Sequence, residues 1–249
     1  MRTRDLLNLR THYRVTVDTL VIDLRRPGRV LSSAPQGGGL RSARYILNHQ
    51  VKVDAVSGGQ RTAGGQPRHP NWGDPARYLR GVANALGVDD DCVGLMTAVP
   101  MNQLVIGHEE SDGIWVDCFA TVGITNAVRA GEWPTVESDQ RAIAHFGTIN
   151  LILVTNATLS YAAMVGAAQV VTESKTGILR DHAIPSWTGM PGATGTGTDV
   201  VVIACRVRKK EMRLSYSGTH TVIGAMIGRV VADCVTRGLA GTERWTVYK

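Results

Sequence analysis

Four short stretches of the chain gather small, hydroxyl and ionisable residues beside the ends of expected strands and helices, where α/β folds usually place ligands. The first runs from Gly123 to Gly131 and contains Thr125 and Asn126, which can offer a hydroxyl and an amide to a ligand. A capped turn is the alternative interpretation, because Thr and Asn favour such positions without any function.

The second and third stretches add groups suited to amide chemistry. Thr148 and Asn150 flank the start of an apolar strand, where they either bind a substrate amide or pair across strands. Glu173 is a candidate general base for water, with Lys175 two residues further on as a charged partner. A helical glutamate is otherwise an ordinary surface residue.

The fourth stretch joins two loops separated by one expected strand. The Gly/Thr loop carries Thr196, Thr198 and Asp199, and its N–H groups and hydroxyls suit an oxyanion or a polar rim. The second loop places Thr219 and His220 at an expected helix start, where His220 is either a second candidate base or a capping or core residue. The Gly/Thr loop lacks the Gly-Lys-Ser/Thr ending of a phosphate-binding P-loop and precedes a strand.

Apolar patterning predicts the elements that position these groups. Strands are expected at 15–24 and 29–33, paired around a Pro27-Gly28 turn, and at 92–99, 113–124, 148–155 and 199–205. Helices are expected at 42–51, from Asp74-Pro75 to Gly87, from a Thr158 cap to about Arg180, and from Thr219 to Gly238. Loops are expected at 33–39 and 56–67. The fold prediction is a mixed α/β (α+β) single layered domain over residues 1–249, with a sheet core and helices packed outside.

The composition is that of an ordinary globular protein. The chain has 249 residues, 43% hydrophobic and 19% charged. It shows neither a signal peptide nor an apolar run of membrane-spanning length, which predicts a cytoplasmic protein without a membrane span. The four cysteines lack metal-knuckle or redox spacing and are expected to be buried free thiols.

The net charge of +6 comes largely from residues 2–29 and 206–213. Neither run interleaves the aromatic residues on which single-stranded nucleic acid stacks, so solvated faces are favoured and no nucleic-acid partner is expected. A weak nucleic-acid binder is the lesser alternative, and it predicts strongly salt-dependent retention on DNA.

Seven motifs follow one another along the chain. They are Gly94-Leu-Met-Thr97, Gly123-Ile-Thr-Asn-Ala127, Arg129-Ala-Gly131, Gly147-Thr-Ile-Asn150, Thr172-Glu-Ser-Lys175, the segment 193–199 and Gly218-Thr-His-Thr221. On these motifs the chain resembles the adenosylcobinamide amidohydrolase (CbiZ) family over about residues 30–238. The resemblance implies hydrolysis of the amide that joins the corrin ring's propionyl side chain to aminopropanol in adenosylcobinamide. The product, adenosylcobyric acid, would re-enter cobalamin synthesis. The corrinoid is then substrate, and no cofactor is expected.

Three mechanisms stay open at this point. In the first, Glu173 or His220 activates water, Lys175 or the 196–199 loop with Asp199 is the electrostatic partner, and Asn126 and Asn150 contact the substrate. The remaining expected substrate contacts are Thr125, Thr148, Thr196, Thr198 and Thr219. In the second, Thr148 or Thr219 is a covalent nucleophile. In the third, a metal assists through His220, Asp199 and Glu173, although no compact metal motif is present and no metal site is assigned.

A different class of function also fits the motifs: a corrinoid-binding or carrier protein that keeps the pocket and lacks the catalysis. Such a protein would bind adenosylcobinamide stoichiometrically and release no aminopropanol. A homo-oligomer is compatible with the sequence.

Overall fold

The computed structural model describes residues 9–51, 74–88, 91–133, 147–207 and 213–246. Most of the described strands join one large sheet in the order β4-β3-β2-β11-β8-β6-β5, with β1 paired to β2. Their bounds are β1 His12–Val15, β2 Thr19–Ser32, β3 Gly39–Gln50, β4 Cys92–Thr97, β5 Val105–Ser111, β6 Ile114–Val122, β8 Ile149–Thr155 and β11 Val200–Cys205. The pairs β8–β11 and β3–β4 are parallel, and the other pairs are antiparallel.

The sheet curls, so strands distant in its order face one another. Asn48 of β3 donates a hydrogen bond to Thr121 of β6 (3.0 Å), and Asn150 of β8 donates to the carbonyl of Met96 in β4 (2.8 Å). The inner face buries one hydrophobic cluster, which includes Leu20, Ile22, Val30, Ile46, Leu95, Phe119, Ile152, Val202 and Ala204. The curl therefore brings residues of β3 and β4 close to the start of β8.

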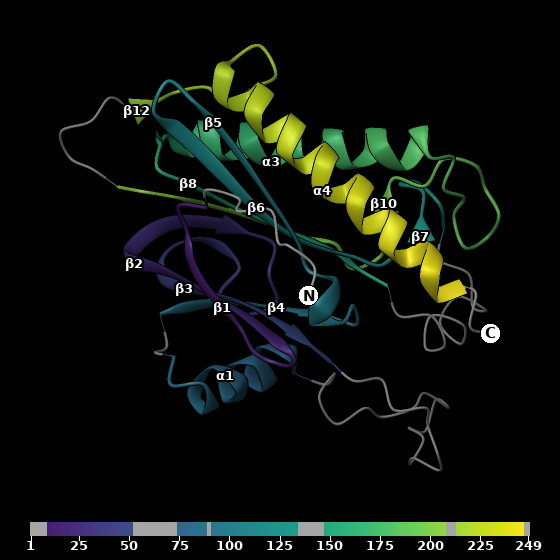
Figure 1. Ribbon diagram of the computed structural model, residues 1–249, viewed down its shortest axis with the longest axis horizontal. Helices are drawn as coiled ribbons and strands as arrows, with labels where there is room; N and C mark the ends of the chain where they lie inside the picture. The colour runs from purple at the N-terminus through teal and green to yellow at the C-terminus, as the bar shows by residue number, and fades with distance from the viewer. Residues whose placement is uncertain (1–8, 52–73, 89–90, 134–146, 208–212, 247–249) are drawn as a thin grey trace, which may run out of the picture.

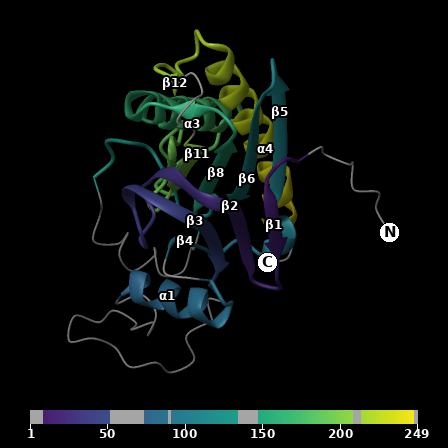
Figure 2. The ribbon, with the colours of Figure 1, turned by 90° about the vertical axis from the view of Figure 1, so that its left-hand side faces the viewer.

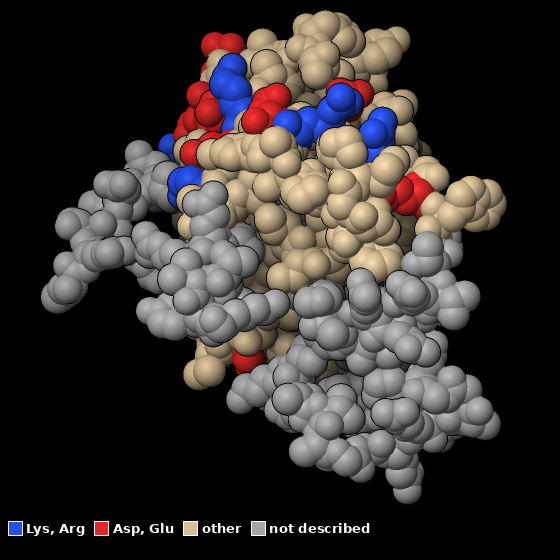
Figure 3. Space-filling view, turned by 90° about the vertical axis from the view of Figure 1, so that its right-hand side faces the viewer, with Lys and Arg blue, Asp and Glu red and all other residues tan. Residues whose placement is uncertain are grey.

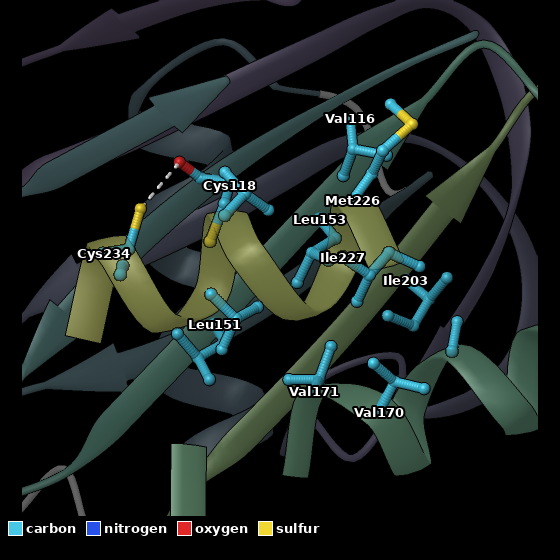
Figure 4. Close-up of a cluster of buried hydrophobic side chains, with 14 of the residues drawn as sticks. Val116, Cys118, Leu151, Leu153, Val170, Val171, Ile203, Met226, Ile227 and Cys234 are labelled. Atoms are coloured by element: carbon cyan, nitrogen blue, oxygen red, sulfur yellow. Dashed lines mark hydrogen bonds between the residues drawn. The ribbon is translucent and has the colours of Figure 1, made fainter. Parts of the chain in front are cut away.

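Helices cover the outer faces. Helices α3 (Tyr161–Asp181) and α4 (Val222–Thr246) pack on the outer face of β6, β8 and β11, and α1 (Pro75–Ala85) packs on the outer face of β2, β3 and β4. The helices therefore lie on opposite sides of the molecule (Figures 1 and 2). Figure 4 shows the core beneath α3 and α4, where aliphatic and sulfur side chains meet from Val116, Cys118, Leu151, Leu153, Val170, Val171, Ile203, Met226, Ile227 and Cys234. None of the described helices combines the length and apolar character that crossing a bilayer requires.

Short elements complete both ends of the sheet. Strand β7 (Ala127–Val128) pairs with β10 (Gly195–Thr196) at the end where β8 and β11 begin. Strand β9 (Thr158–Leu159) pairs with β12 (Arg213–Leu214) beyond the end where β8 and β11 finish. A 3-10 turn, η1 (Met101–Gln103), links β4 to β5. Figure 1 shows β12 on one side of the molecule and the β7–β10 pair on the other.

The predicted mixed α/β fold, with a sheet core and helices outside, is confirmed. The predicted strands at 92–99, 113–124, 148–155 and 199–205 correspond to β4, β6, β8 and β11. Asp74 caps α1 as expected, accepting a hydrogen bond from the Arg77 N–H (2.9 Å), and Pro75 is its first residue. All four cysteines are buried and free. The expected loop at 56–67 lies outside the described residues.

The helix predicted at 42–51 is wrong, because these residues belong to β3. Ala43 and Ile46 are spaced like one face of a helix, but both faces of this strand are buried. Ala43 and Ile46 point into the sheet interior and Leu47 packs under α1. Burial of the second half of this strand on both faces removes the strict alternation of apolar and polar residues that marks a half-buried strand, so periodicity alone does not distinguish it from a helix.

The turn predicted at Pro27-Gly28 is also wrong, because β2 continues through it. The pairing register with β3 shifts between Asp23 and Gly28, and Arg25 has a φ of 66°. Proline is tolerated in a sheet at such an irregularity, since its missing N–H removes no ladder bond there. A Cβ on Gly28 would lie 2.9 Å from the carbonyl oxygen of Cys205, so the glycine lets β11 approach the bulge.

Two helix ends differ from expectation. Ser160, not Thr158, caps α3 by accepting a hydrogen bond from the Ala163 N–H (2.9 Å), and Thr158 lies in β9. Helix α4 continues through Gly238 to Thr246. A Cβ on Gly238 would lie 2.5 Å from the side chain of Val122, so this glycine permits close helix–strand packing and does not end the helix.

His49 links β3 to α1 and should make stability pH-dependent. Its Nδ1 and Nε2 form hydrogen bonds with the Thr19 hydroxyl (2.8 Å) and the Tyr78 hydroxyl (2.9 Å). Burial lowers the pKa of His49 from its ordinary value of 6.5, and the Asp18 carboxylate offsets part of this effect. The unfolded chain therefore binds a proton at His49 once the pH falls below that value, whereas the folded protein binds it only at a lower pH.

Acidification from neutral pH to about pH 5.5 is thus expected to reduce the free energy of unfolding, by at most about 1.4 kcal/mol per pH unit through this group. The loss stops once the pH reaches the lower pKa of the folded state. Urea unfolding of the wild type and of His49→Asn at both pH values measures it. A pH effect as large in the variant as in the wild type would contradict the assignment.

Candidate active site

A buried ion pair joins α3 to the start of β11. The Lys175 Nζ lies 2.5 Å from Oδ2 of Asp199, and the two side chains are 7% and 12% exposed. Lys175 is on the side of α3 that faces the sheet, and Asp199 directly precedes β11. Opposite charges this well shielded from water interact more strongly than a surface pair, but each also depends on the other for compensation.

The Asp199 carboxylate is held by four donors. Besides Lys175, the Ile149 N–H donates to Oδ1 (2.9 Å), the Thr196 N–H donates to Oδ2 (3.0 Å) and the Thr196 hydroxyl donates to Oδ1. Gly195 is needed beside this pair, because a Cβ there would lie 2.7 Å from the Lys175 Nζ. The carboxylate is therefore fixed in orientation, and it fixes the ammonium in turn.

A neutral polar network begins at Thr198, one residue before Asp199, and lies on the inner face of the sheet. The Thr148 hydroxyl donates to the carbonyl of Thr198 (2.9 Å). The Asn150 amide donates to Oδ1 of Asn48 (2.9 Å), and the Asn48 amide donates to the Thr121 hydroxyl. Asn48, Thr121 and Asn150 are at most 1% exposed, so the network is internal.

Asn48 and Thr121 were not identified from the sequence. The available signal was an amide directly after the apolar pair Ile46-Leu47, which a strand assignment would have indicated to be buried. Because 42–51 is predicted as a helix, the position of Asn48 against β8 could not be foreseen.

The loop after β6 completes the arrangement. A Cβ on Gly147 would lie 2.6 Å from Oδ1 of Asn126 and 2.8 Å from the Thr125 nitrogen, so this loop packs directly on the residue before Thr148. Oδ1 of Asn126 is buried and has no hydrogen-bond partner among the described residues. It is an acceptor to which a ligand N–H can donate.

The structure thus gathers eight of the residues predicted for the site. Hydrogen bonds connect six of them: Lys175, Asp199, Thr196, Thr198, Thr148 and Asn150. Thr125 and Asn126 lie beside them across Gly147.

Figure 3 looks onto the end of the molecule that carries β7 and β10. There the described charged residues form a band along one side, and a broad adjoining area is uncharged.

Three other predicted residues lie elsewhere. Glu173 is exposed and lines a shallow groove on α3 with Gln169, Thr172 and Arg180. Two residues along a helix correspond to about 200° of rotation, so Glu173 and Lys175 leave nearly opposite sides of α3.

Thr219 and His220 are exposed just before α4. Their loop is tied to the first turn of α3, because the Ser217 hydroxyl donates to the carbonyl of Ala163 (2.5 Å). Ala163 and Lys175 are twelve positions apart on α3, or about 18 Å along its axis. His220 is therefore remote from the ion pair.

The three ligands proposed for metal assistance, Glu173, Asp199 and His220, are thus dispersed. Within the ranges that the structure describes, no three His, Cys, Asp or Glu residues gather as a metal site would require.

Comparison with known proteins decides the family. The family described as CbiZ, adenosylcobinamide amidohydrolase, matches residues 5–246. The chain belongs to this family. The matched range is longer than the resemblance over about residues 30–238 that the motifs indicate, and the family supports a hydrolase of the amidohydrolase kind.

Two curated proteins are similar to this chain over most of its length. The uncharacterized protein MJ1613 of Methanocaldococcus jannaschii is 31% identical over 245 residues, covering 91% of this chain and 87% of that protein. The adenosylcobinamide amidohydrolase of Methanosarcina mazei is 29% identical over 234 residues, covering 91% and 96%. Among solved structures, the PH0078 protein from Pyrococcus horikoshii OT3 is 14% identical and covers 92% of this chain and 78% of its own, with a TM-score of 0.40, too low to support any conclusion.

Proposed function

We propose that this protein hydrolyses the aminopropanol amide of adenosylcobinamide, releasing adenosylcobyric acid and aminopropanol in corrinoid salvage. The observation that carries the proposal is the buried Lys175–Asp199 pair beside threonine and asparagine groups, in a chain of the adenosylcobinamide amidohydrolase family. The placement of Lys175 next to neutral hydrogen-bonding groups supports chemistry on an uncharged amide.

The neutral character of the site suits the substrate. Adenosylcobinamide presents a large ring edged by carboxamide side chains, which need hydrogen-bond partners and not counter-charges. The hydroxyls of Thr125 and Thr198 are in exposed residues, and the buried Asn126 Oδ1 can accept an amide N–H.

Lys175 supplies the charge that amide hydrolysis requires. The reaction builds negative charge on the carbonyl oxygen and must deliver a proton to the departing amine. An ammonium has three donors, and among the described residues Lys175 gives one to Asp199. The other two can stabilise the oxyanion, while Asp199 holds the ammonium in position.

Two sources of nucleophile are compatible with this role. Water activated by Glu173 or His220 is the first, although both lie away from Lys175. A threonine is the second, and the contacts favour Thr196 over Thr148 or Thr219, because its hydroxyl donates to the Asp199 carboxylate. In that case Oγ1 of Thr196 attacks the carbonyl carbon, its proton passes to Asp199, aminopropanol leaves with a proton from Lys175, and water cleaves the resulting ester.

The function is tested by incubating the purified protein with adenosylcobinamide and following both products by mass spectrometry. Release of aminopropanol and adenosylcobyric acid in equal amounts over many turnovers is the expected result. Stoichiometric binding of the corrinoid without release of either product would instead identify a carrier protein.

A further inference from the structure

A cavity lies at the opposite end of β8 and β11 from the Lys175–Asp199 pair. It has a volume of about 310 Å³, and its walls include Thr155 and Cys205, the last residues of these parallel strands. Strands of six or seven residues span about 20 Å, which separates the cavity from the ion pair. The carboxyl ends of parallel strands are a common place for ligands in α/β folds.

The cavity is strongly basic. Four arginines line it, Arg10, Arg25, Arg26 and Arg206, together with His12. Among the described residues of its wall, the one carboxylate is Asp23, which is already bound by Arg44 through two hydrogen bonds (3.0 and 3.2 Å). The hydrogen bonds from Arg44 lower the pKa of Asp23, so this carboxylate stays paired and charged. The formal charges of these described wall residues therefore sum to plus three.

Two of the arginines are available to a ligand. Arg10 binds Glu110 (3.3 Å), and Arg25 forms a hydrogen bond with Nδ1 of His12 (2.9 Å). Arg26 and Arg206, in contrast, have no carboxylate partner among the described residues, and Arg206 lies over the Trp115 ring at 5.9 Å. Two guanidinium groups without counter-charge at one cavity are a site for an anion.

Thr11 gives an independent indication of a ligand. This residue lines the cavity and is 8% exposed, and its hydroxyl oxygen is buried without a hydrogen-bond partner among the described residues. The Thr11 N–H donates to the buried Asp117 (2.8 Å), so the backbone here is fixed. A buried hydroxyl without a partner is costly unless a bound molecule supplies one.

We propose that this cavity is a second ligand site, which binds the phosphate group of a small molecule through Arg26, Arg206 and the Thr11 hydroxyl. Guanidinium forks match phosphate oxygens, which accept several hydrogen bonds at once. The volume is at the small end of ligand pockets and accommodates a phosphate with a short organic group beside Trp115. The site is distinct from the neutral face proposed for the corrinoid and does not depend on that assignment.

Isothermal titration of the full chain with pyrophosphate, and separately with glycerol 3-phosphate, tests this proposal. Binding at one site per chain is expected for at least one probe, and tighter binding of the ester than of pyrophosphate would identify an organic phosphate as the natural class. Arg26→Gln and Arg206→Gln should each weaken binding about tenfold or more, and Thr11→Val should weaken it severalfold. Hydrolysis of adenosylcobinamide should be unchanged in these variants.

Arg229→Gln is the matched control, because Arg229 is an exposed arginine on α4 bound to Glu109 (3.1 Å), and Arg229 does not line this cavity. It should leave phosphate binding unaltered. Absence of binding by both probes overturns the proposal, as does binding that the three cavity variants weaken no more than Arg229→Gln does.

Discussion

Lys175→Met is expected to reduce kcat/KM for adenosylcobinamide at least about 100-fold and to lower the free energy of unfolding by about 3–5 kcal/mol. The activity falls because the only ammonium in the hydrogen-bonded cluster of described residues is lost. The stability falls because the carboxylate of Asp199, whose side chain is 12% exposed, loses the opposite charge that offsets the cost of its burial. Product release and urea unfolding measure the two effects separately.

The double variant Lys175→Met/Asp199→Asn separates catalysis from folding. It removes both charges, and an asparagine oxygen can still accept the hydrogen bond that the Ile149 N–H gives to Asp199. Most of the lost stability should return, because a neutral replacement of a buried pair avoids the uncompensated charge. Activity should stay low. Recovery of wild-type turnover together with stability would show that the pair only supports the fold.

Gly147→Ala is expected to lower kcat/KM by about 100-fold, because a misplacement of about 1 Å near the reacting groups has effects of this size. A Cβ at this position would lie 2.6 Å from Oδ1 of Asn126, 2.8 Å from the carbonyl of Gly123 and 2.8 Å from the Thr125 nitrogen. These contacts involve backbone, so the loop after β6 must move away from Thr148. Steady-state kinetics with adenosylcobinamide and thermal unfolding check the result.

Gly197→Ala is the control for this substitution. Gly197 lies in the Gly/Thr loop of the same site, but an added Cβ there meets nothing within 4 Å. Its kinetics should remain within a factor of about two of the wild type, since the substitution displaces nothing. Equal kinetics for the two alanine variants would mean that the position of the Asn126 loop does not matter for hydrolysis.

Elements with one clear pattern could be predicted from the sequence, and elements shaped by tertiary contacts could not. Helix α1 begins with a cap and a proline, and β11 is a continuous apolar run, so both were found. Strand β3 was missed because the curled sheet buries it from both sides. The bulge in β2 was interpreted as a turn because Pro27-Gly28 is a turn dipeptide wherever no neighbouring strand holds it.

The same distinction applies to the residues of the candidate site. Thr148, Asn150 and Asp199 could be placed together because they stand at the starts of two strands, which prove to be parallel neighbours. The direction of a helical side chain is harder to predict. Glu173 and Lys175 are only two positions apart in one motif, yet only Lys175 faces the sheet. The separation of His220 from this site depends on the course of α4, which no local pattern specifies.

The most direct test of the central claim is aminopropanol release from adenosylcobinamide by the wild type and by Lys175→Met/Asp199→Asn, compared at equal concentrations of folded protein. Hydrolysis by the wild type and its loss in the folded double variant are the predicted results. Equal release by both proteins, or no release by either, would contradict an amidohydrolase whose active site is built on this ion pair.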